Sequence, residues 1–121
     1  MISYTTLGTN DLQRSGRFYD ELLSGIGAQR SFEGERMIGW SVGAGRPMFG
    51  VIRPFNGRPA TVGNGTMVAI EVDTPERVAE LYEKALSLGG ADEGGPGLRF
   101  GTFYVAYFRD LDGNKVALVR M

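Results

Sequence analysis

The side chains able to carry chemistry in this chain are restricted by two missing residue types. None of its 121 residues is a histidine or a cysteine. Zinc, iron and nickel sites usually take imidazole or thiolate ligands, and a Ser-His-Asp triad needs histidine. Proton transfer is therefore left to Asp, Glu, Tyr, Lys and Arg. We therefore expect no metal ion at the usual ligand positions and no cofactor, and acid–base chemistry is the chemistry that these side chains can carry.

Glu71 and Tyr4 are the candidates for that chemistry, because the alternation of β-like segments groups them with apolar residues. In segment 66–72, one set of side chains packs under a helix and the alternate set faces away from it. The alternate set is Met67, Ala69 and Glu71, and the same parity groups Ile2, Tyr4 and Thr6 near the N-terminus and Ala117 and Val119 near the C-terminus. A carboxylate in this position acts as an acid or base if apolar side chains surround it, and is merely solvated at the end of a strand.

These residues outline a mostly apolar wall with few polar atoms, the usual lining of a small-molecule pocket. Aromatic residues that could add flat surfaces for a planar ligand are Trp40, Phe49, Phe103, Tyr104 and Tyr107. We predict that the ligand contacts are Tyr4, Thr6, Trp40, Phe49, Met67, Ala69, Tyr104 and Ala117. Tyr4 and Met67 equally suit a closed core, and Trp40 equally suits the core or an interface.

The elements that position these residues occur twice. Residues 6–28 align without gaps with residues 69–91, and each copy runs from an apolar strand through a helix to a glycine stop. Asn10 or Asp11 caps the first helix, and Thr74 caps the second with Pro75 at its first position. Further β-like segments lie near 28–33, 36–43 and 47–53, and two more flank a turn at 110–114. Together with the repeat they indicate the order βαβββ–βαβββ. We predict one α+β domain, with modules at about 1–58 and 64–121.

Three stretches resemble the vicinal oxygen chelate superfamily, which includes glyoxalase I, bleomycin-resistance proteins and extradiol dioxygenases. They are 7–23 (LGTNDLQRSGRFYDELL), 63–70 (GNGTMVAI) and 108–119 (FRDLDGNKVALV), although Leu111 stands where proline is common. The resemblance implies that two tandem βαβββ modules form a cupped, mainly antiparallel sheet with helices outside and a ligand cavity inside. Members frequently pair as dimers, so a homodimer is expected. Whether the modules pair within one chain or across a dimer stays open.

Metal-dependent members of this superfamily usually hold the metal with residues on the first strand of each module and near the last. In this chain those positions are Tyr4, Met67 and Ala117, with a fourth near Phe49 or Gly50. A phenol is a weak ligand at neutral pH, a thioether suits only soft metals, and a methyl group offers nothing. The resemblance therefore implies the fold, whereas these residues argue against classical metal-dependent activity.

Other features exclude partners. The net charge is −1 and the arginines are scattered, so nucleic acid is not an expected partner. No apolar run is long enough to span a bilayer, no secretory signal is visible, and a cytoplasmic location is expected by default.

Segment 94–101 (GGPGLRFG) is interpreted as a loop in which Arg99 either holds an anion or is exposed to solvent. Asp110-Leu111-Asp112-Gly113 begins like a calcium loop but lacks the later acids, so we interpret it as a turn.

Three functions follow from these patterns. The first is a metal-free protein of the glyoxalase or bleomycin-resistance type that binds a small molecule, such as an aromatic one, in the cup of its sheet. The second is a glyoxalase- or dioxygenase-type lyase or oxidoreductase with displaced metal ligands, or with metal-free acid–base chemistry by Glu71 or Tyr4. The third is a protein-interaction domain whose cup is filled by its own aromatic residues.

Overall fold

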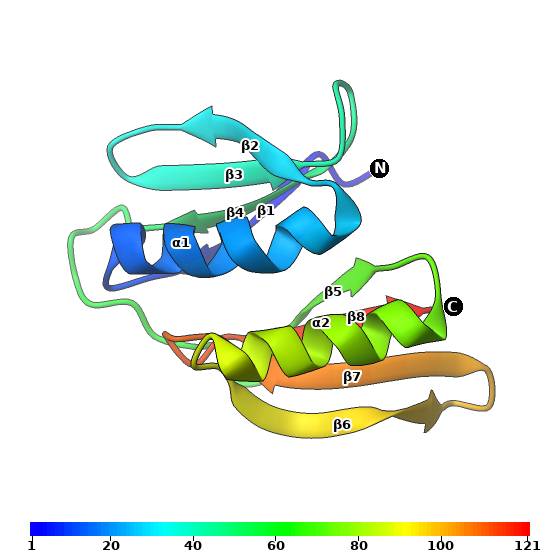
Figure 1. Ribbon diagram of the computed structural model, residues 1–121. Helices are drawn as coiled ribbons and strands as arrows, with labels where there is room; N and C mark the ends of the chain where they lie inside the picture. Colours follow the sequence, from blue (N-terminus) through cyan, green and yellow to red (C-terminus); the bar gives the residue numbers. More distant parts are fainter. The chain divides into compact units, whose positions relative to one another are not determined.

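The computed structural model describes all 121 residues, which divide into two compact units, Met1–Thr61 and Val62–Met121. Each unit contains four strands and one α-helix in the order βαβββ (Figure 1). The predicted pair of βαβββ modules is confirmed. Neither helix is long and apolar enough to cross a membrane.

The first unit is a four-stranded sheet with one helix packed on it. Its elements are β1 (Tyr4–Gly8), α1 (Leu12–Leu23), a 3-10 turn (Ser24–Ile26), β2 (Gln29–Glu33), β3 (Met37–Ser41) and β4 (Met48–Ile52). The strand order is β1-β4-β3-β2, with β1 parallel to β4 and the other pairs antiparallel. Of the two predicted N-caps, Asp11 is the cap, since its carboxylate accepts from the Arg14 amide at 3.0 Å.

Aromatic rings fill the space between α1 and this sheet. Tyr19, on the buried side of α1, is fully buried, and its ring centroid lies 5.6 Å from that of Trp40 and 4.8 Å from that of Phe49. Residues of β3 and β4 with this parity therefore face the helix, and the alternate residues face away from it.

The second unit repeats the arrangement. Its elements are β5 (Val68–Glu71), α2 (Pro75–Ser87), β6 (Ala91–Arg99), β7 (Phe103–Arg109) and β8 (Lys115–Arg120). The strand order is β5-β8-β7-β6, again with one parallel pair, β5 and β8, and two antiparallel pairs. Thr74 caps α2 by accepting from the Arg77 amide at 3.1 Å, and Pro75 opens the helix as predicted. The helix buries Val78, Leu81, Tyr82 and Ala85.

Strand β6 corrects the interpretation of its glycine-rich segment as a loop. Residues Gly94 to Gly97 lie within β6, where the pairing with β7 shifts register on either side of Gly94. Two conditions allow this sequence in a strand. First, β6 is the edge of its sheet, so Pro96 need not donate to a neighbour. Second, Gly94 adopts φ +151°, a conformation suited to an irregular pairing.

The segment that begins like a calcium loop is a turn, as interpreted from the sequence. Asp110 Oδ1 accepts hydrogen bonds from the backbone amides of Asp112 and Asn114, both at 2.9 Å, and Asp110 Oδ2 accepts from the Asn114 side chain at 3.1 Å. Gly113 completes the turn with φ +87°. Because the turn engages both carboxylate oxygens of Asp110, it sets the register of the β7–β8 hairpin.

Candidate ligand-binding site

In the second unit, α2 lies over one face of the sheet (Figure 1), and the opposite face carries apolar side chains. Alternate residues of β7 and β8 are completely buried on the helix side, namely Ala106, Phe108, Val116 and Leu118. The residues between them form a separate apolar cluster of Val105, Ala117 and Val119, with the half-buried Phe103 and Tyr107 packed against it. This cluster is the centre of the candidate site.

Strand register shows which predicted residues share this face. Ala69 pairs with Ala117, and Glu71 pairs with Val119, so the parity expected for β5 and β8 agrees with the pairing. Tyr107 also pairs with Ala117, and Val105 pairs with Val119. Side chains that are direct partners point to the same side of a sheet. Ala69, Ala117 and Val119 therefore lie on one face together with Tyr107, and Met67, just before β5, continues the alternation of Ala69.

Two cationic side chains flank the Tyr107 ring. The Lys115 ammonium lies 5.0 Å from the ring centroid, and the Arg99 guanidinium carbon lies 5.9 Å from it. Arg99 is half-buried at the end of β6, where its Nη2 donates to the carbonyl of Gly95 at 2.9 Å. Arg99 is therefore not fully exposed to solvent, and its side chain folds back along its own strand.

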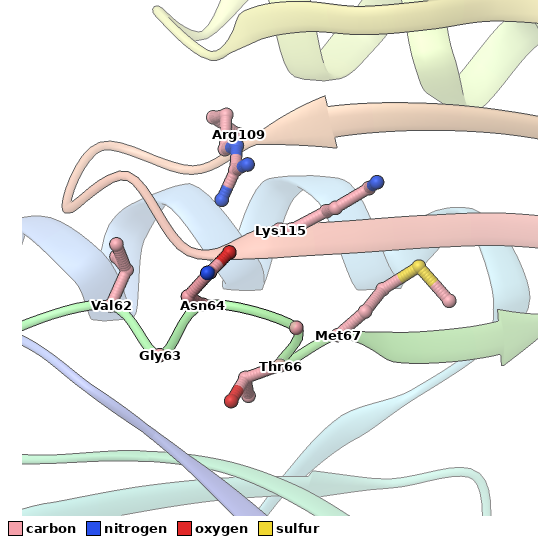
Figure 2. A pocket seen from close by; sticks show the side chains of 8 residues that line it. Val62, Gly63, Asn64, Thr66, Met67, Arg109 and Lys115 are labelled. Atoms are coloured by element: carbon pink, nitrogen blue, oxygen red, sulfur yellow. The ribbon is translucent and has the colours of Figure 1, made fainter.

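A pocket of about 500 Å³ lies at one end of this face (Figure 2). It is lined by Val62, Gly63, Asn64, Gly65, Thr66, Met67, Arg109 and Lys115. The Met67 and Lys115 side chains extend in the same direction in Figure 2, and both residues carry the parity of the apolar face. Arg109 is held by Glu93, with a guanidinium–carboxylate distance of 2.7 Å, and donates to the Gly113 carbonyl at 3.1 Å.

Glu71, the predicted acid–base candidate, is at the edge of this site. Its side chain is 67% exposed and lies 3.7 Å from the guanidinium of Arg120. A solvated, charge-paired carboxylate has the properties of a surface residue. The solvated alternative for Glu71 therefore describes it better than the catalytic one.

The first unit places Tyr4 and Thr6 on the face of its sheet opposite α1. Both are exposed, and they pair with Met48 and Gly50. On this face the Met48 side chain lies directly over Gly39, where an added Cβ would collide with it. A methionine over glycine makes an adaptable apolar surface. Gly50, and not Phe49, is thus the residue on the Tyr4 side.

Three predicted ligand contacts lie elsewhere. Trp40 and Phe49 pack against Tyr19 beneath α1, and the Trp40 indole N–H donates to Asp20 at 2.9 Å. Tyr104 alternates with the cluster residues of β7 and has the parity of the α2 side. These residues therefore lie outside the candidate site. Their roles are explained by core packing, because each has the parity that its helix covers.

Tyr107 was named only among the aromatic residues that could add a flat surface, and Lys115 was not named, although the sequence contains a signal for both. Once Asp110 is recognised as opening the turn, Arg109 pairs with Lys115 and Tyr107 pairs with Ala117. Ala117 was already placed on the open face by parity. Counting residues back across the turn from Ala117 therefore gives Tyr107, and not Tyr104, as the tyrosine on the open face.

The positions where the superfamily resemblance implies metal ligands do not fit a metal ion. They hold a phenol at Tyr4, a thioether at Met67, a methyl group at Ala117, which is 1% exposed, and no side chain at Gly50. No group of three or more Asp, Glu, His or Cys side chains lies close enough together to hold an ion. These donors do not form a site for a hard or borderline metal.

The perturbed pKa values of the chain lie at helix–strand contacts instead. The Arg30 hydrogen bond, with help from Trp40, lowers the pKa of Asp20. In the second unit, the Tyr82 hydroxyl donates to Asp92 at 2.8 Å, which raises the pKa of Tyr82 and lowers that of Asp92. In each unit, a hydrogen-bonded side-chain pair therefore fastens the helix to the strand that follows it.

Comparison with known proteins agrees with this geometry. The model of the Glyoxalase/Bleomycin resistance protein/Dioxygenase superfamily matches residues 1–118. The chain belongs to this superfamily. A solved glyoxalase/bleomycin resistance protein from Albidiferax ferrireducens is 34% identical, with a TM-score of 0.92 over 100% of this chain and 98% of that one.

More distant members of the superfamily share the fold. A glyoxalase-related enzyme from Fulvimarina pelagi is 24% identical, with a TM-score of 0.77 over 98% of this chain and 86% of that one. A lactoylglutathione lyase from Agrobacterium tumefaciens is 21% identical, with a TM-score of 0.71 over 98% of this chain and 92% of that one. No curated protein is similar enough to count as a match.

Proposed function

We propose that this superfamily member binds a small organic molecule on the apolar face of its second sheet, without a metal ion. The observation that carries the proposal is the cluster of Val105, Ala117 and Val119, bordered by Phe103 and Tyr107 on the face that α2 leaves uncovered. Ligand sites usually consist of a cluster of apolar side chains with a few polar groups at its margin.

The side chains favour binding over catalysis. Ala117 and Met67 replace donors that a metal-dependent mechanism would require, and Glu71 is exposed and paired with Arg120. The superfamily name covers bleomycin resistance proteins as well as glyoxalases and dioxygenases. No contact in the second unit favours a lyase or an oxidoreductase over a binding protein.

We also propose that the protein forms a homodimer. Each sheet ends in strands with one unpaired edge, β1 and β2 in the first unit and β5 and β6 in the second. Unpaired backbone donors and acceptors at such edges favour association. Sedimentation velocity at micromolar concentration tests this, and a purely monomeric species would contradict it.

The test of ligand binding is a screen of small aromatic and aliphatic compounds against isotope-labelled protein in the presence of EDTA. We expect saturable shifts of the Val105, Tyr107 and Ala117 amides. The variant Ala69→Leu places a larger side chain on the exposed position beside Ala117 and should weaken binding at least about ten-fold, the loss expected when a pocket is filled.

The matched control is Ser87→Leu, which adds a leucine at an exposed position of α2. This variant should bind as the wild type does. Compounds that bind Ala69→Leu and the wild type equally well, or that shift only residues outside the face, would contradict the proposal.

A further inference from the structure

We infer that the pocket beside this face binds the carboxylate of a small organic acid, and that Lys115 is the residue that anchors it. The inference rests on the proposed function and names its ligand class. The lining of this pocket contains two cationic side chains and no acidic one.

The two cations are not equivalent. Arg109 is neutralised by Glu93 at 2.7 Å, and a second guanidinium nitrogen donates to the Gly113 carbonyl. Lys115 belongs to no ion pair of the chain, and its ammonium lies 5.0 Å from the centroid of the Tyr107 ring. The positive charge available to a ligand is therefore that of Lys115.

Strand pairing makes this arrangement costly unless an anion offsets it. Lys115 pairs directly with Arg109 across β7 and β8, and like charges in such pairs repel. Glu93 offsets the charge of one member only. The Tyr107 face holds the Lys115 ammonium near the apolar cluster, where a charge-assisted hydrogen bond gains strength from the lower dielectric.

The loop of residues 63–66, which also lines the pocket, supplies further donors. Gly65 adopts φ +94°, and the backbone amides of Asn64 and Gly65 donate to no acceptor in the chain, nor does the Asn64 side-chain amide. Loop amides in such a conformation form concave anion sites. An ammonium and a set of amide donors around one pocket match the oxygens of a carboxylate.

The adjacent surface indicates what the carboxylate is attached to. Met67 lines the pocket and carries the parity of Ala69, so an apolar group that leaves the pocket meets a thioether and then the apolar cluster. A thioether accommodates varied apolar shapes. The expected ligand is thus an acid with a compact apolar or aromatic body.

The test compares acids with their uncharged amides. Benzoate and phenylacetate are titrated against benzamide and phenylacetamide, and dissociation constants are taken from the amide shifts of Gly63, Gly65 and Ala117. We expect each acid to shift the two glycines and to bind about ten-fold more tightly than its amide, the effect of one charge-assisted hydrogen bond.

Lys115→Gln should remove this preference, so that acid and amide bind alike. The matched control is Arg99→Gln, which also removes a cation from the Tyr107 ring but lies outside the pocket. It should keep the preference to within about two-fold, since charges away from the contact are screened by salt.

The outcomes separate the two proposals. If amides bind the face as tightly as acids in the wild type, or if Lys115→Gln retains the preference, the anion site is wrong and ligand binding by the face stands. If neither acids nor amides shift any residue of the face or the pocket, both proposals are overturned. Loss of preference in both Lys115→Gln and Arg99→Gln would assign it to overall charge and overturn the role of Lys115.

Discussion

Asp20 fastens α1 to two strands of the first sheet, and removing its carboxylate should destabilise that unit measurably. Its Oδ1 accepts from Arg30 Nε at 2.8 Å and from the Trp40 indole at 2.9 Å, and its Oδ2 accepts from Arg30 Nη2 at 2.7 Å. Trp40 is only 2% exposed, so Asp20→Ala leaves a buried N–H without an acceptor. Asp20→Asn keeps an oxygen for the indole but removes the charge.

The magnitude follows from these two contacts. A buried donor that loses its partner costs about 1–3 kcal/mol. The Arg30–Asp20 pair adds at most about 1 kcal/mol, because its side chains are 28% and 40% exposed and solvent screens them. We expect Asp20→Ala to lower the free energy of unfolding by about 2–3 kcal/mol and Asp20→Asn by about 1 kcal/mol.

The difference in the free energy of unfolding between the wild type and Asp20→Asn should depend on pH in a defined direction. Arg30 holds the pKa of Asp20 below its usual range, so the stabilisation is fully present above the unfolded-state pKa and is lost as pH falls through the folded-state pKa. The gap between wild type and Asp20→Asn should be constant above about pH 5 and should close as pH falls below about 4.

Urea unfolding followed by Trp40 fluorescence measures these values, because Trp40 is the single tryptophan and belongs to the first unit. Glu33→Gln is the matched control. It removes the other acidic partner of Arg30 but leaves the indole contact, and Glu33 is 63% exposed, so the change should be under about 0.5 kcal/mol. A loss of less than about 0.5 kcal/mol in Asp20→Ala would refute the reasoning.

Three further predictions concern backbone strain and metal binding. Gly113→Ala should lower the free energy of unfolding by about 1 kcal/mol, since φ is +87° there, and an unchanged urea midpoint would contradict it. Phe100→Asn should raise it by about 0.5 kcal/mol, because Phe100 holds φ +52° and is 83% exposed, and asparagine tolerates that conformation; a lower midpoint would be the opposite result. Thermal unfolding should be the same in EDTA as in Zn²⁺ or Ni²⁺, and a rise of several degrees with metal would reveal a site that the side chains do not indicate.

Local signals in the sequence predicted the helix caps and the turn well, because a single residue determines each of them. Asp11 and Thr74 each cap a helix through a hydrogen bond to the amide three residues on, and Asp110 closes its turn with its own carboxylate. Such contacts lie within a few residues, so the residue types and their spacing are sufficient to predict them.

The candidate site was predicted only in part, because the face of the sheet to which a side chain points depends on the register of the strands. Alternation in the sequence placed Ala69 and Ala117 on one face, and the pairing of β5 with β8 brings these two residues together. Trp40 was left open between ligand contact and core, and in the structure its indole N–H donates to Asp20, twenty residues away in sequence. An aromatic residue with a distant partner for its N–H suits a core as well as a pocket, and only the tertiary contact distinguishes the two.

Strand β6 was missed for a related reason. Glycine and proline predict a loop when the neighbours of a segment are unknown. At a sheet edge, the unpaired side tolerates Pro96, and the shift in register at Gly94 accommodates the rest. Its position at the edge is a property of the whole sheet and cannot be read from residues 94–97 alone.

Calorimetric titration of a screened compound that shifts the Ala117 amide, performed once in EDTA and once after incubation with Zn²⁺, Ni²⁺ or Mn²⁺, tests the central claim most directly. Metal-free binding by the second sheet predicts dissociation constants that agree to within about two-fold under all conditions. Binding that appears only after a metal ion is added would contradict it.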